Sequence, residues 1–145
     1  MNKIFPCPER ETDRIVYALV HAAHELERRY DEALAPEGLT AAKFAALCKL
    51  VQAGRALGLG ELADKLTCVR SNITQLVDRL ETDGLVVRVV DPADRRTVRA
   101  EVTELGMKRQ AEGAKHVERL LEAFSLSLKG QDLGAFENVL SALVM

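Results

Sequence analysis

Cysteine is scarce in this 145-residue sequence, and no long apolar run is present. The three cysteines, an odd number without paired spacing, do not form a disulfide framework, which is typical of proteins in a reducing compartment. The first ten residues, MNKIFPCPER, have no long apolar core, so we expect neither secretion nor membrane insertion. These absences together predict a cytoplasmic protein.

Catalytic signatures are absent as well. The sequence has no glycine-rich phosphate loop, no GxSxG elbow and no HExxH motif, and we expect its many carboxylates on solvated helix faces. His21 and His24 have a spacing that can hold a metal, but two ligands are not a site and His116 is far away in the sequence. We therefore expect no enzyme, no metal centre and no cofactor.

The length, with nearly half of the residues apolar, is enough for one compact domain. Residues 65–100 contain seven basic and five acidic side chains, whereas residues 1–40 contain five basic and eight acidic ones. The central stretch is thus the basic part of a chain whose formal net charge is −2. If it binds DNA, we expect modest non-specific affinity and a strong dependence on salt.

The central stretch has the pattern of two short helices joined by a tight turn. Apolar residues recur at helical spacing in the first segment, at Leu59, Leu62, Ala63 and Leu66. The turn is Thr67–Val69. A second helix begins near Arg70 and places on one face Ile73, Leu76, Val77 and Leu80. We expect this second helix to expose its opposite face.

That opposite face is built of side chains that can hydrogen-bond base edges. Ser71 and Gln75 are best placed by helical angle, and the predicted DNA contacts of the helix are Arg70, Ser71, Asn72, Thr74, Gln75 and Arg79. Asp78 also faces outward. Because a carboxylate is unfavourable beside phosphate, we expect Asp78 to pair with a neighbouring arginine instead.

A two-stranded hairpin is predicted next. Gly84 is placed to end the helix, residues 85–90 are mostly β-branched and apolar, and residues 97–102 alternate. The turn between them presents Arg95 and Arg96 to solvent, and a narrow minor groove attracts arginines of this kind. Arg88, on the first strand, has two interpretations, a phosphate contact or a pair with an acid. Helix, turn, helix and hairpin in this order are typical of a winged helix-turn-helix, which reads DNA.

Longer amphipathic helices flank this stretch. We expect one helix from Glu9 to Leu34, a second capped by Thr40 and ended by Gly54, a third from Thr103-Glu104 to about Leu128, and a last one around residues 133–143. We expect four side chains of the second helix to face inward, namely Phe44, Leu47, Cys48 and Val51. The seams of the terminal helices are narrow, which favours packing against a second copy over the alternative, a closed monomeric core.

The segments LADKL at 62–66, RSNITQLVDRL at 70–80, GLV at 84–86 and DPADRR at 91–96, with Leu105-Gly106, resemble the MarR family of bacterial transcriptional regulators. The sequence departs from the family at Thr67–Val69, where a glycine, an apolar residue and a serine are common. Losing that serine removes a usual N-cap, typically a loss of about 1 kcal/mol.

The resemblance implies a mainly α fold with a small β-hairpin wing, namely a winged helix-turn-helix with N- and C-terminal dimerisation helices. One domain would span residues 1–145, with a DNA-reading part at about 40–102 and dimerisation helices at about 9–34 and 103–145. It implies a homodimer that binds double-stranded DNA at a pseudo-palindromic operator, with Arg96 in the minor groove, Asp94 orienting it, and Arg95 on phosphate.

The resemblance also implies a repressor that a small phenolic or other aromatic ligand releases. The ligand would lie between the dimerisation helices and the DNA-reading part, where we place His24, Tyr30 and Phe44. Binding there would change the spacing of the two recognition helices, provided that the ligand prefers the DNA-incompetent spacing.

Two alternatives stay open. A redox sensor would act through a cysteine, and Cys7 is the candidate because it lies in a Pro-Cys-Pro segment near Arg10, whereas Cys48 and Cys68 occupy apolar helical positions. A winged-helix protein-interaction module would use the same fold without contacting DNA.

Overall fold

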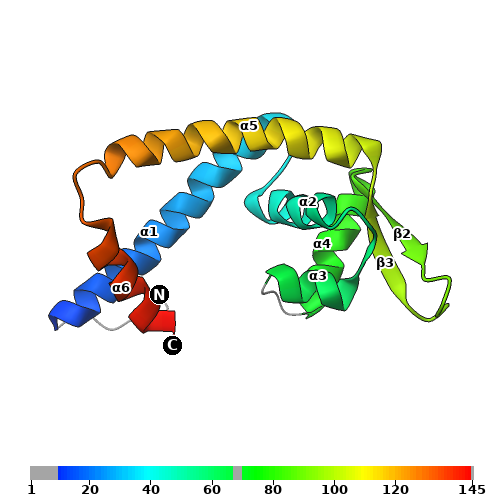
Figure 1. Ribbon diagram of the computed structural model, residues 1–145, viewed down its shortest axis with the longest axis horizontal. Coiled ribbons are helices and arrows are strands. Elements are labelled where there is room, and N and C mark those ends of the chain that lie inside the picture. The colour runs from blue at the N-terminus through cyan, green and yellow to red at the C-terminus, as the bar shows by residue number, and fades with distance from the viewer. Residues whose placement is uncertain (1–9, 67–69, 145) are drawn as a thin grey trace, which may run out of the picture.

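The computed structural model describes residues 10–66 and 70–144 (Figure 1). The helices and strands along the chain are α1 (Glu11–Leu34), the 3₁₀ turn η1 (Ala35–Glu37), α2 (Ala41–Ala53), β1 (Leu57–Gly58), α3 (Leu59–Leu66), α4 (Arg70–Thr82), β2 (Val86–Val90), β3 (Val98–Val102), α5 (Glu104–Ser127) and α6 (Leu133–Val144). We call residues 41–102, from α2 to β3, the winged lobe.

The molecule has the shape of an arch. Helix α5 runs along its top, α1 and α6 form one side, and the winged lobe forms the other (Figure 1). The predicted mainly α fold with a winged helix-turn-helix is confirmed. Within the described residues, none of the helices combines the length and the apolarity that crossing a bilayer requires.

The helix boundaries follow from local capping chemistry. Thr40 and Thr103 both have extended backbones, and their side-chain oxygens accept from Lys43 N at 3.2 Å and from Gly106 N at 3.0 Å. These bonds satisfy amide groups that have no partner within the helix. Gly54 ends α2 with φ 64°, a left-handed conformation that glycine adopts without strain. The predicted starts and ends of these helices are therefore confirmed.

The wing is a three-stranded sheet rather than the predicted two-stranded hairpin. Strand β3 lies between β1 and β2 and is antiparallel to both, with Leu57 opposite Ala100 and Val86 opposite Val102. Strand β1 escaped prediction because two residues are too short to show an alternating pattern. It buries Leu57 completely and fastens the start of α3 to the sheet.

The hydrophobic core lies mainly inside the winged lobe. Five of the eight predicted inward residues of α3 and α4 are buried, whereas Leu59, Leu66 and Leu76 are partly buried and pack against the core. The fully buried large side chains are Leu34, Leu47, Leu50, Leu57, Leu62, Ile73, Leu80, Val77 and Val86. The first turn of α5 is fixed to this lobe at Gly106. A Cβ there would lie 2.1 Å from the carbonyl oxygen of Leu85, so only glycine allows the approach.

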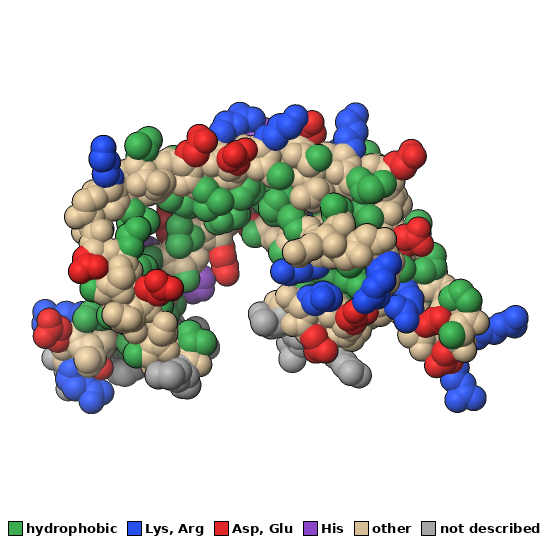
Figure 2. All heavy atoms as spheres, viewed as in Figure 1, with side chains coloured by type: hydrophobic (Ala, Val, Ile, Leu, Met, Phe, Trp, Pro, Cys, Tyr) green, Lys and Arg blue, Asp and Glu red, His purple; other side chains and the backbone are tan. Residues whose placement is uncertain are grey.

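The side of the arch formed by α1 and α6 is different. None of the described residues of α6 is buried, and Phe136 and Leu143 are 48% and 54% exposed. Figure 2 shows apolar side chains on this side of the molecule as well as beneath α5. A single copy of the chain therefore leaves a large apolar surface open to water.

Candidate nucleic-acid interface

Helix α4 exposes polar side chains on the face that points away from the core. Ile73, Val77 and Leu80 anchor its inner face, each at most 1% exposed. The exposed outer residues include, among the predicted DNA contacts, Asn72, Thr74, Gln75 and Arg79. Arg70 and Ser71 lie in the first turn of α4, but their side chains, like residues Thr67–Val69, lie outside the described part of the chain.

Arg88 forms an ion-paired bridge between the wing and α4. Its two terminal nitrogens contact Asp78 Oδ1 at 2.5 Å and Glu81 Oε1 at 2.9 Å, and its backbone N donates to Glu81 Oε2 at 3.1 Å. The hydrogen bond with Asp78 is the largest cause that raises the pKa of Arg88. Of the two interpretations of Arg88, the structure thus shows the pair with acids, and it shows the expected arginine partner of Asp78.

Glu81 was not among the predicted site residues. It lies one helical turn after Asp78, so both carboxylates face β2 from the same side of α4. This bridge fixes the orientation of the wing relative to the helix that would read DNA.

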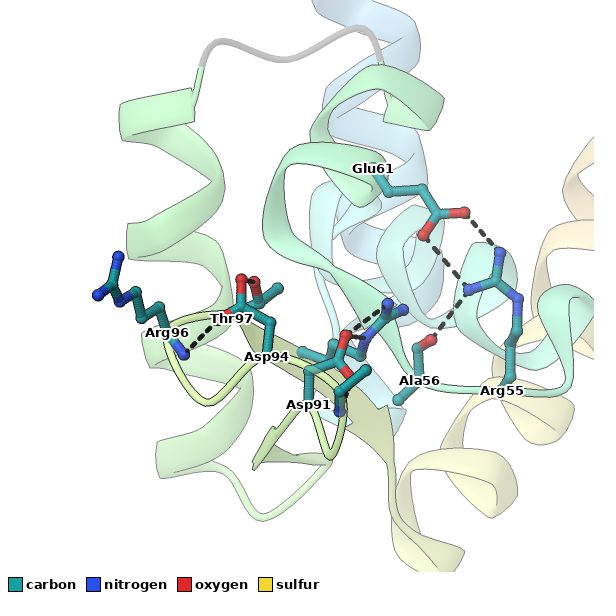
Figure 3. A network of polar contacts seen from close by, with 9 residues as sticks. Arg55, Ala56, Glu61, Asp91, Asp94, Arg96 and Thr97 are labelled. Carbon is teal, nitrogen blue, oxygen red and sulfur yellow. Dashed lines mark hydrogen bonds and ion pairs between the residues drawn. The ribbon is translucent and has the colours of Figure 1, made fainter.

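The wing turn is held together by two aspartates (Figure 3). Asp91 Oδ1 accepts from Ala93 N at 2.9 Å, and Asp91 Oδ2 pairs with Arg99 at 2.9 Å. The Ala93 bond first, and then the Arg99 bond, lower the pKa of the Asp91 carboxyl. Asp91 therefore stays ionised and keeps the two strands joined at the base of the turn.

Asp94 organises the second half of the turn. Its carboxylate accepts from Arg96 N at 3.0 Å and from Thr97 Oγ1 at 3.1 Å. The expectation that Asp94 orients Arg96 stays a prediction, and the contact that the structure shows is with the backbone N of Arg96 rather than with its guanidinium. This pattern is an Asx turn, which fixes where the arginine starts but leaves its tip free.

The guanidinium groups of Arg95 and Arg96 contact no acidic side chain among the described residues, and both arginines are exposed. Figure 3 shows Arg96 pointing away from the aspartates, while Arg55 pairs with Glu61 elsewhere in the lobe. In Figure 2, basic side chains are the outermost groups at the tip of the wing. A turn that two aspartates hold in shape therefore presents two positive charges, neither with an acidic partner in the described part of the chain, on the same lobe as the exposed face of α4.

A second feature is a pocket of about 490 Å³ between α1, α2 and α5. Its lining is mainly apolar and includes two of the three predicted ligand-binding residues, Tyr30 and Phe44. The third, His24, is exposed on α1 and does not line this pocket, so its part in a ligand site stays a prediction. His24 and Tyr30 are six positions apart, which at 100° per residue places them about 120° apart around α1, on different faces.

Cys48 also lines this pocket, although its apolar helical position predicted a small buried residue. Its side chain is half-buried, and Gln110 Nε2 donates to its sulfur at 3.5 Å. The thiol is only half-buried because the pocket opens on this face of α2. Cys7, the candidate for redox sensing, lies outside the described residues, and that hypothesis stays a prediction.

Comparison with known proteins places this geometry. The sequence model of the MarR family matches residues 39–98, which span most of the winged lobe. YsmB, an HTH-type transcriptional regulator of Bacillus subtilis, is 31% identical over 126 residues, 87% of this chain and 86% of that protein. The chain belongs to the MarR family.

Solved structures of MarR-type regulators share the fold over almost the whole chain. The transcriptional repressor CouR, bound to a 23-mer DNA duplex, superposes with a TM-score of 0.78 at 29% identity and covers 97% of this chain and 100% of that one. The organohalide-sensing regulator RdhR, in its 2,4-dichlorophenol-bound form, has a TM-score of 0.83 at 20% identity, over 99% of this chain and 88% of that one. This MarR-family chain is therefore a transcriptional regulator and not an enzyme.

Proposed function

We propose that this regulator is a homodimeric repressor that binds a pseudo-palindromic operator and that a small aromatic ligand releases. The observation that carries the proposal is the wing tip, where Arg95 and Arg96 are unpaired among the described residues and lie beside the polar face of α4. In this arrangement α4 enters the major groove and reads base edges through Asn72 and Gln75. Arg96 enters the adjacent minor groove.

The likeness to CouR supports the DNA-bound pose, since CouR is 29% identical to this chain and its structure was solved with a DNA duplex. Arg79 and Arg95 lie at the edges of this surface, where phosphates would pass. Arg88 makes no direct contact in this pose, because Asp78 and Glu81 already engage its guanidinium. Its role becomes that of holding the wing against α4.

The apolar surface of α1 and α6 supports a homodimer. A hollow between these helices is lined almost wholly by aliphatic and aromatic side chains, among them Leu19, Leu26, Phe136 and Leu140. A second copy that covers this surface would place two winged lobes on two half-sites about one DNA turn, roughly 10 bp, apart.

The pocket beside Tyr30 and Phe44 supports an aromatic effector. The volume is in the range of small-molecule sites, and an aromatic ring fits between two aromatic side chains. Lys49 and Glu27 bring charge to the same lining, and neither has an ion-pair partner among the described residues. A ring that carries a carboxylate would meet Lys49. CouR of Rhodococcus jostii RHA1, at 25% identity, is bound to p-coumaroyl-CoA.

Fluorescence anisotropy with the DNA upstream of the gene, across a salt series, tests the proposal. We expect Arg96→Ala to weaken operator binding about tenfold or more, as for loss of a specific groove contact. Arg55→Ala is the matched control, because it removes the same charge from an arginine that is paired with Glu61. Aromatic acids and phenols titrated into the complex should release the DNA.

Equal effects of the two substitutions would contradict the role of Arg96. The operator proposal as a whole would be refuted by a protein that, at low salt, binds no DNA more tightly than random DNA. This must hold both for the upstream DNA and for sequences selected from a random DNA library.

A further inference from the structure

The connection between α1 and α2, residues 34–39, is a tight turn that joins the two sides of the arch. We call it the elbow. Leu39 N donates to Leu34 O at 3.2 Å across it, and both leucines are buried. Asp31, one turn before the end of α1, accepts from Ala41 N at 2.7 Å. The end of α1 and the start of α2 are therefore fixed to one another, and the elbow moves as a unit.

Helix α5 holds this elbow at two points through one residue, Glu37. Arg109 Nη1 donates to the Glu37 carbonyl oxygen at 2.6 Å, and His116 Nε2 lies 3.3 Å from Glu37 Oε1. The two side chains of the second contact are only 20% and 24% exposed. Arg109 and His116 are two helical turns apart on α5, so the pair resists both sliding and rotation of α5 over the elbow.

Between these two contacts α5 packs tightly against both α1 and α2 at Gly113. A Cβ on Gly113 would lie 3.1 Å from Leu34 Cδ2 and 3.2 Å from two ring carbons of Phe44. The missing side chain lets α5 rest directly on the elbow. Phe44 and Val117, which flank this crossing, also line the pocket between α1, α2 and α5.

The winged lobe is thus joined to α1 and α5 at three places. The elbow leads into α2, and the β3–α5 junction is held by Thr103 Oγ1, which donates to Gly84 O at 2.7 Å. The Glu37 contacts make the third connection by tying the elbow to the middle of α5. Without them, α5 still packs on the elbow around Gly113, but the lobe gains freedom to rotate about its junction with the start of α5.

We infer that Glu37 is a positioning residue that fixes the angle between the winged lobe and helix α5. Because Phe44 and Val117 belong to the crossing and to the pocket, a ligand that displaces either side chain acts on this angle directly. The angle of the lobe sets the separation of two recognition helices in a dimer. The consequence for operator binding rests on the proposed function, whereas the angle itself is a property of the single chain.

Double electron–electron resonance detects changes in that angle, without DNA, through the distance between two spin labels. Spin labels on Thr82→Cys in α4 and Glu122→Cys in α5, both exposed positions, report the distance between the winged lobe and α5. The native cysteines are replaced by serine, and labelled chains are diluted with unlabelled protein so that only pairs within one chain contribute. Glu37→Ala removes the carboxylate that contacts His116 and keeps the backbone carbonyl that accepts from Arg109. We expect a narrow distance distribution in the parent protein and a broader one with Glu37→Ala.

Further variants make the result specific. His116→Ala should broaden the distribution as Glu37→Ala does, and the double substitution should add little. Glu37→Gln keeps one side-chain acceptor oxygen, which His116 Nε2 can still contact, and should restore a narrow distribution. Glu32→Ala is the control, because it removes a carboxylate whose ion pair with Arg28 lies within one helix. An unchanged width with Glu37→Ala, or with His116→Ala should the first variant fail to fold, overturns the inference.

Operator binding supplies the second readout. The measured quantity is the ratio of affinities for an operator with the best half-site spacing and for one with the half-sites moved by one base pair. We expect this ratio to be about threefold to fivefold smaller in Glu37→Ala than in the parent protein, the loss expected for one partly exposed charged contact. A parent protein that binds no DNA refutes the proposed function and leaves the resonance result to decide on Glu37. DNA binding with an unchanged spacing preference refutes the role of Glu37 alone.

Discussion

Replacing Arg88 by alanine separates a residue that positions the wing from one that contacts DNA. In the free protein its guanidinium bridges Asp78 and Glu81, whose side chains are 58% and 42% exposed, while Arg88 itself is 25% exposed. Exposed pairs contribute about 0.2–1 kcal/mol each, and the buried part of the arginine stem adds packing. We expect Arg88→Ala to lower the free energy of unfolding by about 1–2 kcal/mol.

Two assays on the same variant divide the possibilities. Urea unfolding followed by circular dichroism gives the loss of stability. A salt series of operator affinities gives the slope of log K against log salt, which changes by about 0.9 for each phosphate that is no longer neutralised by the protein. Because the Arg88 guanidinium is already engaged by two carboxylates, we expect the affinity to fall while the slope stays within about 0.3 of that of the parent protein.

Arg95→Ala is the matched comparison, since Arg95 lies on the same wing and its guanidinium has no acidic partner among the described residues. It should leave stability nearly unchanged and reduce the salt slope by about 0.9. A full reduction of the slope by Arg88→Ala, with little loss of stability, would show that DNA competes successfully for this arginine and would refute the reasoning.

Three other substitutions test how the elements are joined. Gly106→Ala should destabilise the protein by at least about 3 kcal/mol in urea unfolding, because the added Cβ would lie 2.1 Å from the Leu85 carbonyl oxygen; a stable variant would contradict this close approach. Thr103→Ala removes the N-cap of α5 and the hydrogen bond to Gly84 O, and should cost about 1–2 kcal/mol in the same assay, with Thr103→Ser largely restoring it. Hydrogen bonds from Arg28 lower the pKa of Glu25 to about 2, so the stability that Glu25 adds is present above its unfolded pKa and lost as the pH falls towards 2. The difference in unfolding free energy between the parent protein and Glu25→Gln should therefore shrink between pH 5 and about pH 2, and a constant difference would exclude this pair as its source.

The features that sequence predicted well are those decided by a few neighbouring residues. Thr40 and Thr103 cap helices through bonds to amides three residues ahead, so the signal and the structure lie in the same short segment. The inward positions of α4, such as Ile73 and Val77, repeat at the helical period and are buried as that period requires. Exposure of Arg95 and Arg96 follows from their place in a charged turn.

Features that depend on distant partners were out of reach. The pairing of Glu37 with His116 joins residues 79 positions apart, and nothing in either neighbourhood indicates it. The sequence left an acid partner for Arg88 as one of two interpretations and missed Glu81, because the two carboxylates are seven and ten positions away, on another element. Cys48 shows the same limit on burial, because the face of a helix that borders a pocket has the same period as one that borders a core.

The exposed apolar side chains of α6 have a consequence for the amount of protein in the cell. If a second copy covers them, folding and association share one equilibrium, and tenfold dilution lowers the stability by about 1.4 kcal/mol per dimer. A scarce regulator would then spend more of its time partly unfolded and open to proteases. Abundance would set both how fully the operator is occupied and how long each molecule survives, so that a modest fall in synthesis clears the regulator faster than the loss of synthesis alone would.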